Sequence, residues 1–165
     1  MLYLHSAQLF ILPPHIYSLL YPTQPDIRST RAFIAGVAIV ALGTYIRLDC
    51  FSALGHLFTF DLTSHPDHKL VTDRFYSIVR HPAYAGSMLL VIGLTLSHLT
   101  PGSYLYECWL SRHSALIITI VWWSWTLSVG ISRAIAEDKE MKKLFGSDWD
   151  FYAARVPSWF FPGIY

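Results

Sequence analysis

The sequence has little charge and little cysteine. Only 14% of its 165 residues are charged, whereas soluble domains carry about 25%. The net charge of +1 provides no basic face of the kind that nucleic-acid binding needs. The two cysteines, Cys50 and Cys108, are far apart and form no CxxC pair, which argues against a disulfide framework or a zinc or redox site built on cysteine. Since 53% of the residues are hydrophobic, we expect lipid to solvate much of the surface.

Three long apolar runs, at 32–48, 83–99 and 114–132, dominate the chain. A helix needs about 20 apolar residues to cross the hydrocarbon core, and each run approaches that length with its flanks. A backbone in lipid must satisfy its own hydrogen bonds, so the runs are predicted to be membrane helices rather than buried helices of a soluble protein. Residues 2–20 lack a basic start, and Pro13-Pro14 interrupts them. They are interpreted as a candidate first membrane helix and not as a cleavable signal.

These runs predict an all-α fold, a polytopic integral membrane helical bundle formed by a single domain over 1–165. Two polar stretches separate and follow them: a loop at 49–81, whose first half is apolar enough to be interfacial, and a helix and tail at 133–165 that break at Gly146. Nine of the twelve basic residues lie in or beside these stretches. The positive-inside rule therefore places both stretches in the cytosol, where they are expected to form a pocket together.

The sequence RHPAYAG at 80–86 lies where the polar loop enters a membrane helix. Pro82 suits the first turn of a helix, and the N–H groups of a helix start favour an anion. His81 can donate or accept a proton near neutral pH. A plain helix cap with an arginine extending to the interface explains the same residues, so both interpretations stay open. Gly86 and Gly93 share a helix face, which indicates close helix packing.

Arg133 and Glu137 are four residues apart, hence on one helix face, where the third apolar run ends. They are either functional or an ordinary ion pair at a helix end. His65 and His68 have no helical ligand spacing and no cysteine beside them, so no metal site is predicted.

Taken together, these residues resemble the isoprenylcysteine carboxyl methyltransferase family over about residues 54–162. The first block is HKLVT at 68–72, Tyr76 and RHPAYAG at 80–86; alone, it also resembles phospholipid methyltransferases and some sterol reductases. The second block is Arg133, Glu137-Asp138, Phe145-Gly146, Tyr152 and Val156-Pro157. Two departures stand out. Arg74-Phe75 replace a frequent Gly-Pro, and Glu137-Asp138 replace the usual pair of glutamates.

The resemblance implies methyl transfer from S-adenosyl-L-methionine to the C-terminal carboxylate of a prenylated cysteine. The expected partners are prenylated CaaX-type protein C-termini or small prenylcysteine substrates, and membrane lipid, with no nucleic acid and no metal. The expected location is the endoplasmic reticulum membrane, crossed several times, with the active site facing the cytosol. Two alternatives remain: a phospholipid amine N-methyltransferase and a catalytically inactive membrane paralogue.

The same resemblance assigns residues to roles. The catalytic residues are Arg133 and Glu137, which bind the polar end of the methyl acceptor. The cofactor-binding residues come from the loop and the following helix start: His68, Lys69, Leu70, Val71, Tyr76, His81, Pro82, Ala83 and Tyr84. The prenyl tail is expected in an apolar groove beside Trp122 or Trp125.

Overall fold

The computed structural model describes residues 25–55 and 69–164, and within these ranges the chain forms helices and loops without a strand. The candidate helix at 2–20 and the predicted cofactor residue His68 lie outside the described residues, as does His65. The described elements follow in the order α3 (Arg31–Leu54), η2 (Arg74–Ser77), α4 (Pro82–His98), α5 (Tyr104–Cys108), α6 (Arg112–Phe145) and α7 (Ser147–Arg155). The predicted all-α class is confirmed.

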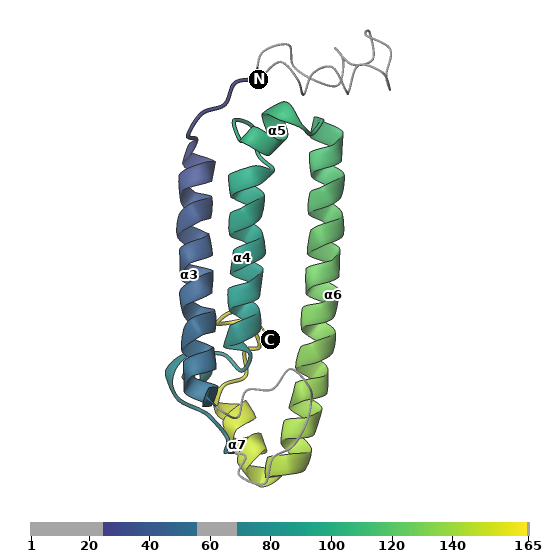
Figure 1. The fold of residues 1–165 in the computed structure, drawn as a ribbon. Helices are drawn as coiled ribbons and strands as arrows, with labels where there is room; N and C mark the ends of the chain where they lie inside the picture. The colour runs from purple at the N-terminus through teal and green to yellow at the C-terminus, as the bar shows by residue number, and fades with distance from the viewer. Residues whose placement is uncertain (1–24, 56–68, 165) are drawn as a thin grey trace.

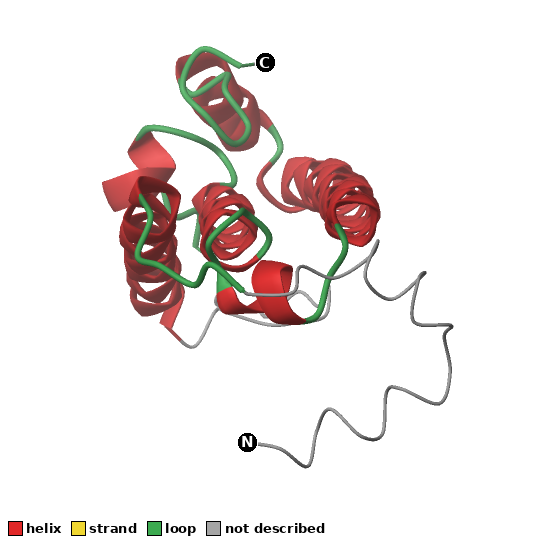
Figure 2. Ribbon diagram, turned by 90° about the horizontal axis from the view of Figure 1, so that it is seen from above, coloured by secondary structure: helices red, strands yellow, loops and turns green. Residues whose placement is uncertain are grey.

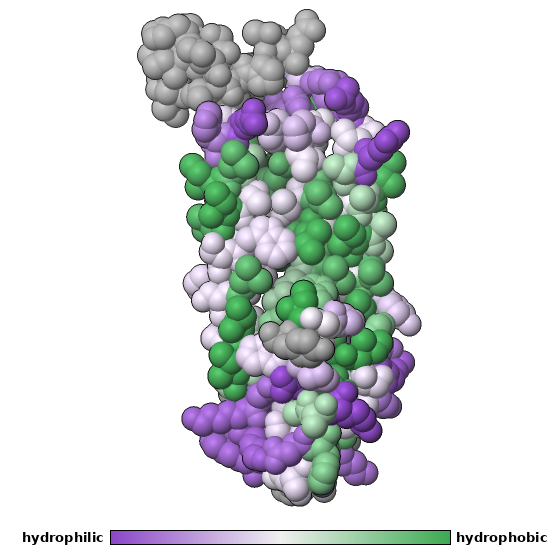
Figure 3. All heavy atoms as spheres, turned by 180° about the vertical axis from the view of Figure 1, so that it is seen from behind, coloured by the Kyte–Doolittle hydropathy of each residue, from purple (hydrophilic) through white to green (hydrophobic). Residues whose placement is uncertain are grey.

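The three long helices run side by side, with α4 between α3 and α6 (Figures 1 and 2). Short α5 lies at one end of this bundle, and α7 lies at the other end with the C-terminal segment (Figure 1). Hydrophobic residues form a band around the middle of the face drawn in Figure 3, and hydrophilic residues gather at both ends. Two described helices, α3 and α6, are long and apolar enough to cross a membrane.

The helix ends follow local chemistry. Thr30 and Ser111 cap α3 and α6, because each side chain accepts a hydrogen bond from a backbone N–H in the first turn, at 3.1 Å in both cases. Gly146 ends α6 with a φ of 54°, a conformation that glycine adopts without steric penalty. The predicted break at Gly146 is therefore confirmed. The separate helix expected from residue 133 onward is instead the continuation of α6, with α7 following the break.

One helix is longer than the sequence predicted. The first membrane helix continues past residue 48 to Leu54, because its charged residues find partners: Arg47 donates to the Ala83 carbonyl at 3.2 Å, and Asp49 pairs with Arg74. The predicted run 83–99 forms α4, which has 17 residues and is therefore about 26 Å long. This length is at the lower limit for a membrane crossing.

Glycines bring α3 and α4 into close contact, as the spacing of Gly86 and Gly93 predicted. A Cβ added to Gly93 would lie 2.5 Å from the Gly36 carbonyl oxygen, and one added to Gly86 would lie 2.8 Å from that of Gly43. Such distances leave no room for a side chain, so these glycines set the separation of the two helices. The pair forms a fixed base from which the start of α4 is presented.

Candidate functional site

The start of α4 is anchored by the C-terminal segment of the chain. His81 is the N-cap residue and Pro82 occupies the first turn, as the sequence predicted. The backbone N–H groups of Arg80 and His81 donate to the carbonyls of Ser158 and Trp159, both at 2.9 Å. Among the described residues, no side chain caps this helix start. Its positive end therefore faces its surroundings without a side-chain acceptor.

The His81 side chain is buried between two carboxylates from α6. Its Nε2 lies 2.8 Å from Oδ1 of Asp138, and its Nδ1 lies 3.4 Å from Oε2 of Glu137. Burial by itself lowers the pKa of His81, but the hydrogen bonds to Asp138 and Glu137 outweigh burial and raise that pKa above its ordinary value. The His81 imidazole thus joins the start of α4 to the polar end of α6.

Tyr84 lies one turn into α4 and contacts the same carboxylate. Its hydroxyl donates to Oε1 of Glu137, so Glu137 is held through both of its oxygens. Arg133 is one helical turn before Glu137, exposed on α6, and close enough for its charge to act on Tyr84. The structure therefore brings together four predicted residues: His81, Tyr84, Arg133 and Glu137.

Arg80 and Asp138 complete the cluster, although neither was among the predicted catalytic or cofactor-binding residues. Nη1 of Arg80 donates to Oδ2 of Asp138 at 2.9 Å, and Nη2 donates to the Pro157 carbonyl at 3.2 Å. Nε of Arg80 is buried and has no hydrogen-bond partner among the described residues. Both residues were inside the motifs, Arg80 in the RHPAYAG block and Asp138 in the acidic pair, so the signal for them was present.

Aromatic side chains from the C-terminal segment border the cluster. The ring of Phe160 lies 6.1 Å from the His81 ring and 6.5 Å from that of Tyr84, and the ring of Trp159 lies 6.3 Å from His81. Arg80 lies over the Trp159 ring at 5.7 Å, within the range of cation–π attraction. The aromatic run at 159–161 is the sequence signal for this wall, although no role was predicted for it.

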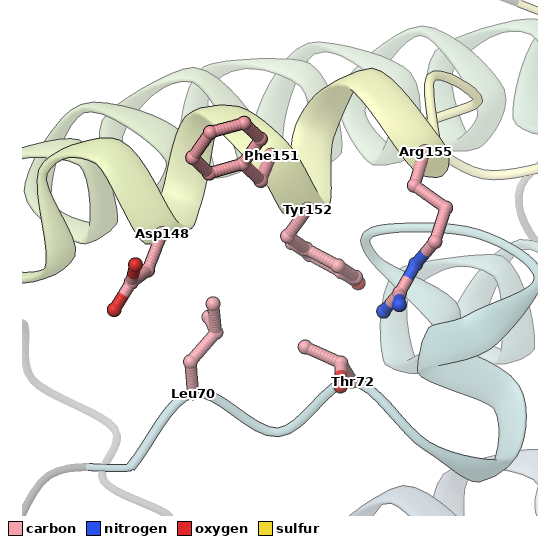
Figure 4. Close-up of a pocket in the computed structure, with 6 residues that line it drawn as sticks. All are labelled: Leu70, Thr72, Asp148, Phe151, Tyr152 and Arg155. Carbon is pink, nitrogen blue, oxygen red and sulfur yellow. The ribbon is translucent and has the colours of Figure 1, made fainter.

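The predicted cofactor loop lies against α7. Leu70 packs on the buried cluster of Trp149, Tyr152 and Val156. Leu70 and Thr72 face α7 across an open pocket of about 190 Å³, which Asp148, Phe151 and Arg155 also line (Figure 4). This volume is below the ~300–1,000 Å³ of typical ligand sites, so the described part of this pocket is small for a cofactor.

The other predicted cofactor residues differ in exposure. Lys69 is exposed and Val71 is half-buried, whereas Pro82 is fully buried and shapes the helix start rather than a surface. The Ala83 carbonyl accepts a hydrogen bond from Arg47, a residue that the sequence prediction did not assign to the site. Tyr76 lies in η2, and burial raises the pKa of its hydroxyl well above the usual value, so this hydroxyl stays protonated.

Comparisons with known proteins point to methyltransferases. A model of the phospholipid methyltransferase family matches residues 31–148, which covers α3 to α6. "Protein-S-isoprenylcysteine O-methyltransferase B" of Arabidopsis thaliana is 29% identical over 125 residues, 74% of this chain and 56% of the relative. "Protein-S-isoprenylcysteine O-methyltransferase" of Schizosaccharomyces pombe is 27% identical over 126 residues, 75% of this chain and 47% of the relative.

A third relative is "Probable protein-S-isoprenylcysteine O-methyltransferase" of Oryza sativa subsp. indica. It is 27% identical over 126 residues, which cover 74% of this chain and 58% of the relative. The resemblance predicted from the two motif blocks is thus confirmed. The chain spans about half the length of the curated relatives it matches.

Proposed function

This chain belongs to the phospholipid methyltransferase family, and from that premise we propose that it is a membrane enzyme that methylates the C-terminal carboxylate of a prenylated cysteine. The observation that carries the proposal is the cluster of His81, Tyr84 and Glu137, which lies where α4 begins, at the polar end of the long apolar helices. Cation and carboxylate groups collected at such a boundary are characteristic of functional sites in membrane proteins.

The proposed methyl donor is S-adenosyl-L-methionine, which supplies a methyl group on a positively charged sulfonium. No side chain caps the start of α4, and the positive end of the helix dipole suits the donor's carboxylate. The rings of Tyr84 and Phe160 suit a cation. The proposed binding residues are those of the loop and helix start: His68, Lys69, Leu70, Val71, Tyr76, His81, Pro82, Ala83 and Tyr84.

The charges of the cluster favour a negative acceptor. Arg80 pairs with Asp138, and the charge of Arg133 acts on Tyr84 beside Glu137, so the cluster keeps a guanidinium near the place proposed for the acceptor. We assign Arg133 to hold the acceptor carboxylate through paired N–H donors. Glu137 fixes Tyr84 and His81 in place, so that the acceptor meets an ordered surface.

A site at the membrane boundary also suits the reaction itself. The acceptor is an anion and the donor a cation, so both charges disappear as the methyl group is transferred. Water stabilises the separated charges, and a site with aromatic walls that exclude water therefore favours transfer. A carboxylate with a pKa near ~4 is already ionised, so the reaction needs no general base and depends on positioning.

The proposed setting is the endoplasmic reticulum membrane, crossed several times, with the cluster facing the cytosol. In this arrangement α4 is a third crossing beside α3 and α6. The prenyl tail lies along α6 near Trp122 or Trp125, and Trp125 is 70% exposed on that helix. The natural substrates in this proposal are prenylated CaaX-type C-termini or small prenylcysteines.

A phospholipid amine is the second candidate acceptor, and the description of the family favours it. An ammonium must lose a proton before it attacks, and Glu137 or Asp138 is the available base. Both carboxylates already accept hydrogen bonds from His81, Tyr84 and Arg80, and neither has been placed against an ammonium. The carboxylate acceptor therefore stays the first proposal.

A transfer assay with labelled S-adenosylmethionine decides between them. The chain, purified in lipid nanodiscs, is offered a prenylcysteine with a free carboxylate or a phospholipid with a primary amine. We expect label on the prenylcysteine as a methyl ester that base releases. Label on the amine alone would overturn the proposal that the acceptor is a prenylcysteine carboxylate. No transfer, together with no thermal stabilisation by S-adenosylhomocysteine, would support the inactive paralogue instead.

A further inference from the structure

One residue of η2 has a backbone conformation that is unfavourable for its type. Arg74 has a φ of 53°, and it is the one non-glycine residue with positive φ in the part of the chain that the structure describes. In this region the Cβ of an L residue crowds the following carbonyl, a clash that glycine avoids. Such a conformation persists only where surrounding contacts hold it, so we expect specific contacts to fix Arg74.

An ion pair and a turn hold Arg74. Its Nη2 lies 2.7 Å from Oδ1 of Asp49 in α3, and the Asp49 side chain is 8% exposed. The Ser77 hydroxyl donates to the Arg74 carbonyl at 2.6 Å, which closes η2 on itself. A carboxylate with so little access to water is unfavourable without a partner. Asp49 therefore needs Arg74, and the same contact keeps Arg74 in its strained conformation.

The next two residues of η2 bind the same region of α3. The Phe75 ring meets the Tyr45 ring edge-on, with centroids 6.0 Å apart, and the Tyr76 hydroxyl forms a hydrogen bond with the Cys50 thiol. Tyr45 and Asp49 are four residues apart and share a face of α3. On the other side, the Tyr152 hydroxyl of α7 donates to the Tyr76 carbonyl at 2.8 Å. Consecutive residues thus fix η2 between α3 and α7.

We propose that the Asp49–Arg74 ion pair positions the loop of residues 69–79 in the conformation that binds the methyl donor. The inference rests on the proposed function, because Leu70, Val71 and Tyr76 of this loop are proposed cofactor residues. Asp49 and Arg74 act through the loop and not on the reacting atoms, so they are positioning residues.

Asp49→Asn tests the pair directly, because it removes the charge and keeps the size. We expect amide hydrogen exchange in residues 69–79 to rise, and the Kd for S-adenosylhomocysteine to rise roughly three- to tenfold, as for a partly exposed charged hydrogen bond. The KM for the donor should rise in the same proportion, while kcat at saturating donor stays within about twofold. Arg74→Lys, which keeps the charge but not the planar guanidinium, replaces this variant if Asp49→Asn fails to fold.

Substitutions at Arg74 separate the ion pair from the strain. Arg74→Ala removes the pair and keeps the unfavourable φ, whereas Arg74→Gly removes both. Exchange in residues 69–79 should therefore be faster with alanine than with glycine. Asp49→Asn combined with Arg74→Gly should not speed exchange beyond Arg74→Gly alone, because the partner is already absent. The matched control is Asp26→Asn near α5. It breaks an exposed ion pair in which Oδ2 of Asp26 lies 3.3 Å from Nη1 of Arg28, and it should change neither the exchange in residues 69–79 nor the Kd for S-adenosylhomocysteine.

Unchanged exchange in residues 69–79 of Asp49→Asn would overturn the proposal, as would equal exchange in the alanine and glycine variants. Faster exchange with an unchanged Kd would overturn the link to the donor. If the unaltered chain does not bind S-adenosylhomocysteine, the proposed function fails, while the exchange measurements still decide whether Asp49 and Arg74 hold the loop.

Discussion

The side chains of the cluster are held in place by one another, because its two carboxylates each contact two partners. Asp138 contacts both Arg80 and His81, and Glu137 contacts both His81 and Tyr84. A change at any member therefore leaves a buried or half-buried partner unsatisfied. Arg133 is exposed, and its proposed partner in the reaction is the substrate. Its substitution tests that proposed role.

Arg133→Lys should lower kcat/KM for the prenylcysteine by about 10- to 100-fold, because a lysine cannot provide the paired donors of a guanidinium. The Kd for S-adenosylhomocysteine should change by less than about twofold, since the donor is held by other residues. The methyl-transfer assay and a binding isotherm measure these quantities. Arg112→Lys, the same change at the other end of α6, is the control. Unchanged turnover in Arg133→Lys would remove Arg133 from its role.

His81 should make the stability of the protein depend on pH. Its pKa is raised in the folded state, so the folded protein binds a proton more tightly than the unfolded chain. The resulting stabilisation is complete below the ordinary value of about 6.5 and disappears as the pH rises through the folded-state pKa. The apparent melting temperature in detergent should fall over this range. His81→Gln, which does not titrate, should lack this fall; the same slope in both proteins would contradict the assignment.

At the scale of elements, the paired glycines decide how closely α3 and α4 approach. Gly93 faces the Gly36 backbone and Gly86 faces the Gly43 backbone, so the contact is between backbones and cannot yield as a flexible side chain does. The same contact sets where α4 begins relative to α3. Arg47 reaches from α3 to the Ala83 carbonyl and therefore depends on this separation as well.

Gly93→Ala should destabilise the protein even though alanine favours a helix by about 1 kcal/mol. The added Cβ would lie 2.5 Å from the Gly36 carbonyl oxygen, and overpacking of this kind typically costs about 1–3 kcal/mol. Gly130→Ala in α6 is the matched control, because its Cβ would meet only the flexible end of Met88 at 3.2 Å. Thermal unfolding in detergent should show a lower melting temperature for the first variant and an equal or higher one for the second. A higher melting temperature for Gly93→Ala than for Gly130→Ala would contradict the close contact between α3 and α4.

At the scale of the whole molecule, contacts between distant segments form one polar end. Tyr152 of α7 bonds η2 at Tyr76, and α6 meets the start of α4 through Asp138. In the proposed membrane setting, these contacts require both polar stretches to lie on one side of the bilayer, which is also what the count of basic residues predicts. The other end carries α5 and residues 25–30, which lead into α3 (Figure 1).

This arrangement predicts the outcome of topology mapping. Single cysteines introduced at Ser77 and Ser147, both exposed, should react with an impermeant maleimide from the cytosolic side of sealed microsomes. A cysteine that replaces Tyr104, which is exposed at the start of α5, should react only from the lumenal side. Replacing Cys108 by serine removes the background label. Labelling of Ser77→Cys and Ser147→Cys from opposite sides would rule out the shared site.

The sequence by itself determined the helical class, the apolar runs and the two motif blocks, because hydrophobic length, proline and glycine act locally. It also predicted the break at Gly146 and the start of α4 at Pro82. Only the tertiary structure decided that Asp138 binds both Arg80 and His81, that Trp159 and Phe160 border the cluster, and that Asp49 holds Arg74. These contacts join residues far apart in the chain, and their geometry depends on how closely the helices pack, which no local pattern encodes.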